Sequence, residues 1–219
     1  MDRIPEPELM THDEQVRAYA EGDFEQPHQR FVDLLLERLP RLGRAGFAID
    51  IGCGPGDIAR RLARALPGWE VHGVDGSAPM LALAREAAER EALQSRLRFH
   101  ECYLPDGAAP RPHYELLLSN SLLHHLADPL ALWQAIRRWS LPTSAVFVMD
   151  LLRPETPREV ERLVDEYAAG EPEVLRRDFH NSLLAAYRPH EVHDQLRRAG
   201  LRELDVEIVS DRHWLVTRG

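Results

Sequence analysis

Short hydrophobic runs alternate along the chain with segments whose hydrophobic positions recur at helical spacing. The runs are rich in Val, Ile, Leu and Phe, which is typical of strands buried on both faces of a parallel sheet. We therefore predict strands at 47–51, 69–74, 97–101, 114–119 and 145–150. The helical segments between them give the strand–helix alternation of an α/β fold with a Rossmann-like, doubly wound parallel sheet.

The amphipathic segments predict helices before, between and after these strands. Asp128 and Pro129 are typical of an N-cap and a first helical residue, Thr156 and Glu159 form a capping-box pattern, and Gly200 is a typical helix terminator. The predicted helices cover 9–22, 27–39, the stretch after Gly56, the stretch after Ser77, 129–136, 156–167, 174–187 and 189–199. Two last strands, 204–209 and 213–217, are predicted to form a terminal antiparallel hairpin.

These elements indicate one large α/β domain and no internal repeat. We divide the chain into an N-terminal helical cap at 1–44 and a ligand-binding domain at 45–219. The helices predicted at 151–188 form an insertion after the fifth strand.

A glycine-rich turn follows the first predicted strand. Gly52, Gly54 and Gly56 come after the acid Asp50, and the helical pattern begins directly afterwards. Glycines permit sharp backbone turns and let a ligand lie against the main chain, with N–H groups facing it. The spacing G-x-G-x-G differs from the dinucleotide fingerprint G-x-G-x-x-G, and Asp57 would repel a pyrophosphate.

A second acid, Asp75, ends the second predicted strand. An ionised carboxylate can accept hydrogen bonds from both hydroxyls of a ribose, which suits Asp75 to a nucleoside pocket. The alternative is that Asp75 only caps the helix that starts near Ser77. Its distance from the glycine-rich turn favours the nucleoside interpretation.

Asp50, the three glycines and Asp75 together resemble motif I and the ribose-binding acid of class I S-adenosyl-L-methionine (SAM) dependent methyltransferases. The segment Leu118–Leu126 is similar to the stretch after strand four in the small-molecule, quinone-biosynthesis branch of that family. The resemblance implies the strand order 3-2-1-4-5-7-6, SAM as cofactor and S-adenosyl-L-homocysteine (SAH) as product. The cofactor-binding residues it implies are Asp50, Gly52, Cys53, Gly54, Gly56, Asp75, Gly76, Ser77, Met80, Glu101, Cys102, Asn120 and Ser121.

Two stretches depart from that family pattern. Many relatives have Asp-Ala after strand three, where this chain has Glu101-Cys102, so the adenine contact stays open. Many relatives also have Pro-Gly-Gly before strand five, where this chain has Leu141-Pro142-Thr143-Ser144, which should alter a turn more than the chemistry.

Methyl transfer is an in-line displacement, so the protein mainly orients the acceptor and excludes water. A base is needed only when the acceptor carries a proton at its reacting atom. His124 and His125 are the candidate catalytic residues, although such a pair often only packs and forms hydrogen bonds. Adjacent histidines are expected to point in different directions, and we predict no metal site.

The acceptor side should be lined by polar and aromatic residues of the predicted capping segments. The densest group lies between Asp178 and Ser182. The candidate substrate residues are Tyr19, Phe24, Asp178, Phe179, His180, Asn181, Tyr187 and Arg188.

The composition restricts the classes of molecule that the protein is expected to bind. A net charge of −9 argues against a nucleic-acid substrate, because such binding needs a basic face. We find no membrane span and no signal-peptide pattern, and we expect a cytoplasmic protein that acts on a small molecule. Cys53 and Cys102 are expected to be free thiols. The oligomeric state and the acceptor atom are left open.

Two other functions remain alternatives at this point. The first is a catalytically silent SAM-binding module whose capping segments mediate assembly. The second is a nicotinamide-dependent oxidoreductase, which only the general strand–glycine–helix geometry favours.

Overall fold

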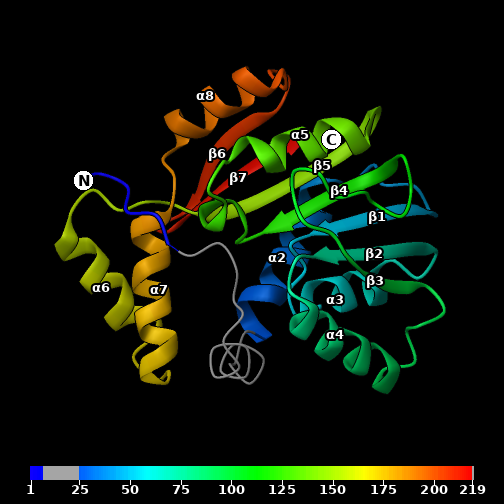
Figure 1. The fold of residues 1–219 in the computed structure, drawn as a ribbon, viewed down its shortest axis with the longest axis horizontal. Coiled ribbons are helices and arrows are strands. Elements are labelled where there is room, and N and C mark those ends of the chain that lie inside the picture. Colours follow the sequence, from blue (N-terminus) through cyan, green and yellow to red (C-terminus); the bar gives the residue numbers. More distant parts are fainter. Residues whose placement is uncertain (7–24, 219) are drawn as a thin grey trace.

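A computed structural model describes residues 1–6 and 25–218 of the chain. Its centre is a seven-stranded sheet in the order β3-β2-β1-β4-β5-β7-β6, which confirms the predicted order (Figure 1). Strands β1 to β5 run parallel to one another, and β7 is antiparallel to both β5 and β6. The strands are β1 (Gly46–Ile51), β2 (Trp69–Asp75), β3 (Leu97–Glu101), β4 (Tyr114–Asn120), β5 (Ser140–Leu151), β6 (Asp205–Ser210) and β7 (His213–Arg218).

Helices cover both faces of the sheet. The helices of the described residues are α2 (Glu25–Arg38), α3 (Asp57–Ala65), α4 (Ala78–Arg90), α5 (Leu130–Trp139), α6 (Pro157–Tyr167), α7 (Glu173–Ala185) and α8 (Pro189–Ala199). Helices α2, α3 and α4 share one hydrophobic cluster with the sheet, and α5 and α8 share another on the opposite face. In α2, Phe31 is fully buried and its ring meets that of Phe147 in β5 edge to face.

The helices α6 and α7 form a separate pair beyond the carboxyl end of β5 (Figure 1). Their contact is a small apolar cluster that includes Val160, Leu163 and Leu183 together with Leu151 of β5. Residues 1–6 lie against this pair, since the amide of Ile4 donates to the carbonyl of Leu184. The pair therefore extends the molecule at the edge where the parallel strands end.

Most predicted boundaries are confirmed within one or two residues, and the start of β5 differs by more. Helix α5 starts at Leu130 and not at Pro129, although Asp128 still accepts a hydrogen bond from the amide of Leu130. Strand β5 begins at Ser140, earlier than expected, because Tyr114 pairs with Ser140 and the register then shifts. The stretch 141–144 is therefore part of an irregular strand and not a free turn. The helix predicted at 9–22 lies outside the described residues.

No helix in the part of the chain that the structure describes is long and apolar enough to span a membrane. Both cysteines are free, as expected.

Candidate functional site

The turn between β1 and α3 is built on three left-handed glycines. Gly52, Gly54 and Gly56 have φ angles of 74°, 52° and 77°. A side chain at Gly52 would collide with Leu122, and one at Gly56 would collide with Phe99. A Cβ at Gly54 would meet nothing within 4 Å. Two of the glycines thus allow close packing, while Gly54 exposes bare backbone to open space.

Asp75 at the end of β2 is tied to this turn. Its two carboxylate oxygens accept hydrogen bonds from the amides of Gly54 at 2.8 Å and Ser77 at 2.7 Å. Burial raises the pKa of the Asp75 carboxyl, and these amide hydrogen bonds oppose the rise. A carboxylate has about four acceptor sites, so capacity for further donors remains. Asp75 therefore braces the helix start and the turn while keeping capacity for a ligand's hydroxyl groups.

Asp50 lies at the end of β1 and is 2% exposed. Burial, with the nearby charge of Asp75, raises the pKa of Asp50 to about 7. One of its oxygens has no hydrogen-bond partner among the described residues. A buried carboxyl in this state is suited to a donor or cation supplied by a ligand.

A cavity adjoins the turn, and we call it the cradle cavity. Among the predicted cofactor residues, those that line it are Asp50, Gly52, Cys53, Gly54, Asp75, Gly76, Ser77, Met80, Cys102, Asn120 and Ser121. Gly56 and Glu101 are not part of this lining: Gly56 packs near Phe99, and Glu101 is exposed at the end of β3. Sequence reasoning missed lining residues that other elements supply, among them His28, Tyr103 and Leu122.

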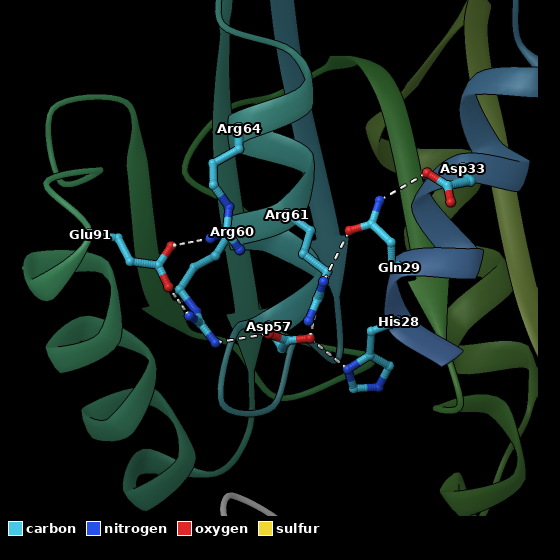
Figure 2. A network of polar contacts seen from close by, with 8 residues as sticks. All are labelled: His28, Gln29, Asp33, Asp57, Arg60, Arg61, Arg64 and Glu91. Atoms are coloured by element: carbon cyan, nitrogen blue, oxygen red, sulfur yellow. Dashed lines mark hydrogen bonds and ion pairs between the residues drawn. The ribbon is translucent and has the colours of Figure 1, made fainter. Parts of the chain in front are cut away.

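Asp57, the acid expected to repel a pyrophosphate, is engaged in a polar network. Its carboxylate contacts Arg60 at 2.9 Å, Arg61 at 2.8 Å and Nδ1 of His28 at 2.8 Å (Figure 2). Burial alone would raise the pKa of Asp57, but His28 and Arg61 outweigh it and hold that pKa well below its usual range. The network ties α2 to the first turn of α3 and places His28 at the edge of the cradle cavity.

The chain turns sharply after β4. Ser121 is one of the few residues other than glycine with a left-handed φ, 53°, a conformation that costs energy and often occurs at functional sites. A short 3₁₀ turn at Leu123–His125 follows. Asp150 of β5 fixes this turn by accepting from the amide of Leu123 at 2.7 Å and contacting Nδ1 of His124 at 2.5 Å.

His124 is 2% exposed and has a carboxylate near each ring nitrogen. Asp150 lies at Nδ1, and Glu6 lies 3.5 Å from Nε2. Burial lowers the pKa of His124, but the two carboxylates outweigh it and the net pKa is raised. The two acids therefore favour the charged form of this buried imidazole.

The expectation that the adjacent histidines point in different directions is wrong. The ring centroids of His124 and His125 are 4.2 Å apart and the planes are inclined by 36°. Glu6 lies beside both, with its Oε1 3.3 Å from Nδ1 of His125. The ligand-type atoms of these three residues lie within 4.8 Å of one another. Spacing along the sequence missed Glu6 because the fold brings it from the far N-terminal end.

A second, larger cavity of about 810 Å³ lies on the other side of the β4 turn, and we call it the outer cavity. Helix α7 lines it with Leu175, Asp178, Phe179 and Ser182, which share one helical face. Other described lining residues come from α2, α6 and the β6–β7 hairpin.

The predicted substrate residues divide by their position on these elements. Asp178 and Phe179 line the outer cavity, whereas the next two residues of α7, His180 and Asn181, do not. Tyr187 is buried under the guanidinium of Arg3, and Arg188 pairs with Glu155. Tyr19 and Phe24 lie outside the described residues.

The two cavities share a wall. The residues that line both are His28, Asn120, Ser121 and His125. They come from α2, from the last residue of β4 and from the turn after it. His124 lines only the outer cavity. A ligand in the cradle cavity and a second molecule in the outer cavity would meet at this shared wall.

Residues 49–143 match a protein family described as a methyltransferase domain. This segment includes the glycine-rich turn, Asp75 and the turn after β4 with both histidines. The match therefore falls on the elements that build the cradle cavity.

Named relatives agree with this match. A demethylmenaquinone methyltransferase of Thermus thermophilus is 40% identical over 83 residues, which are 36% of this chain and 36% of that protein. A trans-aconitate 2-methyltransferase of Afipia carboxidovorans is 28% identical over 84% of this chain and 68% of that protein. The chain thus spans about a third of the first relative and about two thirds of the second.

A solved SAM-dependent methyltransferase from Aquifex aeolicus has the same fold. Its TM-score is 0.67 at 15% sequence identity, and the alignment covers 93% of this chain and 96% of that one. At this identity the likeness concerns the fold alone.

Proposed function

We propose that this chain, which belongs to the SAM-dependent methyltransferase family, transfers a methyl group from SAM to a small-molecule acceptor. The observation that carries the proposal is the shared wall between the cradle cavity and the outer cavity. Donor and acceptor would reach it from opposite sides, as an in-line displacement requires. At most about 7–11 kcal/mol of a barrier can come from such orientation.

The residues of the cradle cavity fit SAM. Asp75 would accept from the ribose hydroxyls, the bare backbone at Gly54 would lie against the nucleoside, and Asp50 would face the ammonium group. When bound, SAM supplies an electrophilic methyl group on a sulfonium and leaves as SAH. Two acids and open backbone suit a cationic ligand better than a pyrophosphate, which disfavours the nicotinamide alternative.

The outer cavity supports a small molecule as acceptor. Its volume of about 810 Å³ falls within the range of about 300–1,000 Å³ that is typical of small-molecule sites. Asp178 and Phe179 of α7 would contact the acceptor there. The net charge of −9 disfavours nucleic acid in the same place.

His125 is the better placed of the two candidate bases. It lines both cavities, whereas His124 is held between Asp150 and Glu6. For an acceptor that carries a proton, His125 would take that proton as the acceptor's lone pair moves toward the methyl carbon.

The first test is binding by calorimetry. We expect SAM and SAH to bind with an affinity on the order of micromolar, and Asp75→Ala to weaken both at least about tenfold. Asp106→Ala, in the loop between β3 and β4, is the matched control and should bind normally. Thermal melting of each variant shows whether the fold persists. No binding of either compound by the unchanged protein would reject the proposal.

The second test is transfer. Labelled SAM is incubated with the protein and with the low-molecular-weight fraction of a bacterial extract, and the products are separated. Label in a small molecule, absent with Asp75→Ala, supports the proposal. SAM binding without any labelled product in such extracts would favour the silent-module alternative, and label in protein or nucleic acid would contradict the small-molecule acceptor.

A further inference from the structure

Residues 1–6 bring a carboxylate to the histidine pair. Arg3 donates to the carbonyl of Ala185 at 2.6 Å and to the carbonyl of His124 at 2.8 Å, so the segment is tied to α7 and to the 3₁₀ turn. Glu6 then lies beside both imidazoles, and its side chain is only 11% exposed. We predicted no metal site from the spacing along the chain, which does not show this third group.

Three atoms of this cluster are separated like ligands around one zinc ion. Oε1 of Glu6 lies 3.5 Å from Nε2 of His124 and 3.3 Å from Nδ1 of His125, and the ligand-type atoms all lie within 4.8 Å of one another. Zinc bonds of about 2.0–2.2 Å place the ligand atoms of a tetrahedral site about 3.3–3.5 Å apart. Both contacts of Glu6 are longer than the usual N–H···O hydrogen bond of about 2.7–3.2 Å. The spacing therefore suits a shared cation better than direct hydrogen bonds.

Neighbouring groups hold two of these side chains as metal ligands are usually held. Asp150 contacts Nδ1 of His124 at 2.5 Å, and Nε2 is the nitrogen in contact with Glu6. Ser182 of α7 donates to Oε1 of Glu6 at 3.0 Å. A metal-binding histidine commonly donates its second N–H to a carboxylate, and a metal-binding carboxylate commonly accepts a further hydrogen bond. Both supports are thus present without an ion.

The charges around the cluster favour a cation. Glu6 and Asp150 act on His124, and Asp178 of α7 acts on Glu6. Arg3 is the cation that opposes these acids at His124. With the imidazoles neutral, as metal ligands must be, the acids among these groups outnumber the one cation, so a divalent ion lowers the repulsion between the carboxylates. In the ion-free protein a proton on His124 supplies part of this charge, and the ion takes its place.

We infer that Glu6, His124 and His125 bind one Zn²⁺ ion, with the fourth position taken by water or by an oxygen atom of the methyl acceptor. Two imidazoles and one carboxylate suit zinc better than magnesium, which prefers oxygen ligands. The same ligand set with an open position occurs in catalytic zinc sites. His124 and His125 both line the outer cavity, so the ion lies at the wall of the cavity where we place the acceptor.

The role of the ion in methyl transfer rests on the proposed function, whereas its binding does not. Zn²⁺ lowers the pKa of a bound hydroxyl group, so an acceptor hydroxyl bound to it loses its proton to solvent more readily. The oxygen keeps the electron pair, which forms the bond to the methyl carbon of SAM, and the electrons of the carbon–sulfur bond leave with SAH. In the zinc-loaded protein this replaces proton transfer to His125, whose Nδ1 is then a ligand.

The first test is zinc binding by the full chain, without SAM or an acceptor. The protein is treated with a chelator, and Zn²⁺ is titrated in a calorimeter. We expect one equivalent to bind with a dissociation constant on the order of micromolar or below. Glu6→Gln and His125→Gln should each weaken binding at least about 100-fold, because the loss of a partner that merely supports a ligand already costs about 10–100-fold.

The control for these variants is His193→Gln, which changes an exposed histidine of α8 and should bind zinc normally. Thermal melting in the presence of chelator shows whether each variant folds. No zinc binding by the unchanged protein would overturn the inference. Equal zinc binding by the folded Glu6→Gln and His125→Gln variants would overturn it as well, because the ion would then lie elsewhere.

The second test replaces Zn²⁺ with Co²⁺, whose visible absorption reports its coordination. We expect the intense absorption of four-coordinate Co²⁺ in the unchanged protein and its loss in Glu6→Gln. Ser182→Ala removes the hydrogen bond to Glu6 but no ligand, so it should weaken Co²⁺ binding about tenfold and keep the spectrum. The weak absorption of six-coordinate Co²⁺ in the unchanged protein would overturn the inference, and this measurement needs no variant to fold.

A third readout is the orientation of the two rings. An imidazole binds a metal ion in the plane of its ring, whereas the rings of His124 and His125 are stacked with centroids 4.2 Å apart. Zinc should therefore turn the rings and shift their ¹⁵N signals in histidine-labelled protein, and unchanged signals at one equivalent of zinc would contradict the site. Zinc binding without methyl transfer would leave this inference intact and count against the proposed function, and SAM-dependent transfer by a protein that binds no zinc would do the reverse.

Discussion

Asp50 shows how burial prepares a single residue for a ligand. The strand β1 carries it into the interior, and burial together with Asp75 raises its pKa to about 7. Since the folded pKa is above that of the unfolded chain, the ligand-free fold loses stability as the pH rises from about 4 to about 7, and no more is lost above that range. A cationic ligand would reverse that penalty by pairing with the ionised form.

We therefore expect SAM affinity to depend on pH in a defined direction. Below about pH 7 the carboxyl of Asp50 must lose a proton before it can pair with the ammonium group of SAM. Affinity should rise about tenfold between pH 6 and 7.5 and then level off. Calorimetry across this range measures it, with Asp50→Asn as the comparison. An equal rise in the variant would show that a different group titrates.

At the scale of elements, the turn between β1 and α3 contains glycines that pack against side chains and one glycine whose backbone is open to the cradle cavity. Gly52 and Gly56 have neighbours that exclude a side chain, while Gly54 has open space. Gly200 provides a comparison, because it ends α8 with a φ of 77° and lies outside both cavities. A Cβ there would approach only the flexible side chain of Arg137, at 3.4 Å.

This contrast gives a matched pair of substitutions. Gly54→Ala and Gly200→Ala should each lower the free energy of unfolding by about 1–2 kcal/mol, because both place a Cβ in the left-handed region. Only Gly54→Ala should weaken SAH binding, by about 100-fold, since its Cβ enters the cradle cavity. Urea denaturation and calorimetry measure the two effects separately. Normal SAH binding by Gly54→Ala would mean that the ligand does not lie against this backbone.

At the scale of the molecule, Asp57 connects two helices that are separated in the sequence, α2 and α3. It pairs with His28 of α2 and with two arginines of its own helix, so the packing of α2 and the shape of the cradle cavity are coupled (Figure 2). Its depressed pKa means that this stabilisation is present above about pH 4 and is lost as the pH falls further.

We expect Asp57→Asn to lower the free energy of unfolding by about 2 kcal/mol at pH 7, because charge-assisted contacts to three partners are lost. Asp33→Asn is the control: Asp33 is exposed on α2 and pairs with Gln29 in the same network (Figure 2). The Asp33→Asn substitution should lower the free energy of unfolding by less than about 0.5 kcal/mol. Urea denaturation of both variants tests this, and equal losses would show that Asp57 contributes no more than a surface residue.

The sequence by itself determined the sheet and the cradle. Hydrophobic runs identify β1 to β5 because parallel strands are buried on both faces. The spacing of Gly52, Gly54 and Gly56 predicts the turn, because it involves only residues that are close together in the chain. Asp50 and Asp75 could be placed at strand ends for the same reason. The order of the strands came from the family resemblance, and the structure agrees with it.

Only the tertiary structure decided what meets at the shared wall. Glu6, His28 and His125 are distant in the chain, and no local pattern predicts that residues 1–6 return to the turn after β4. Helical geometry also separated Asp178 and Phe179, which face the outer cavity, from the adjacent His180 and Asn181. The glycine-rich turn depends on residues that are close together in the chain, so it can be predicted from the sequence pattern. A site between two cavities depends on contacts between distant segments, and these contacts leave no local pattern in a single sequence.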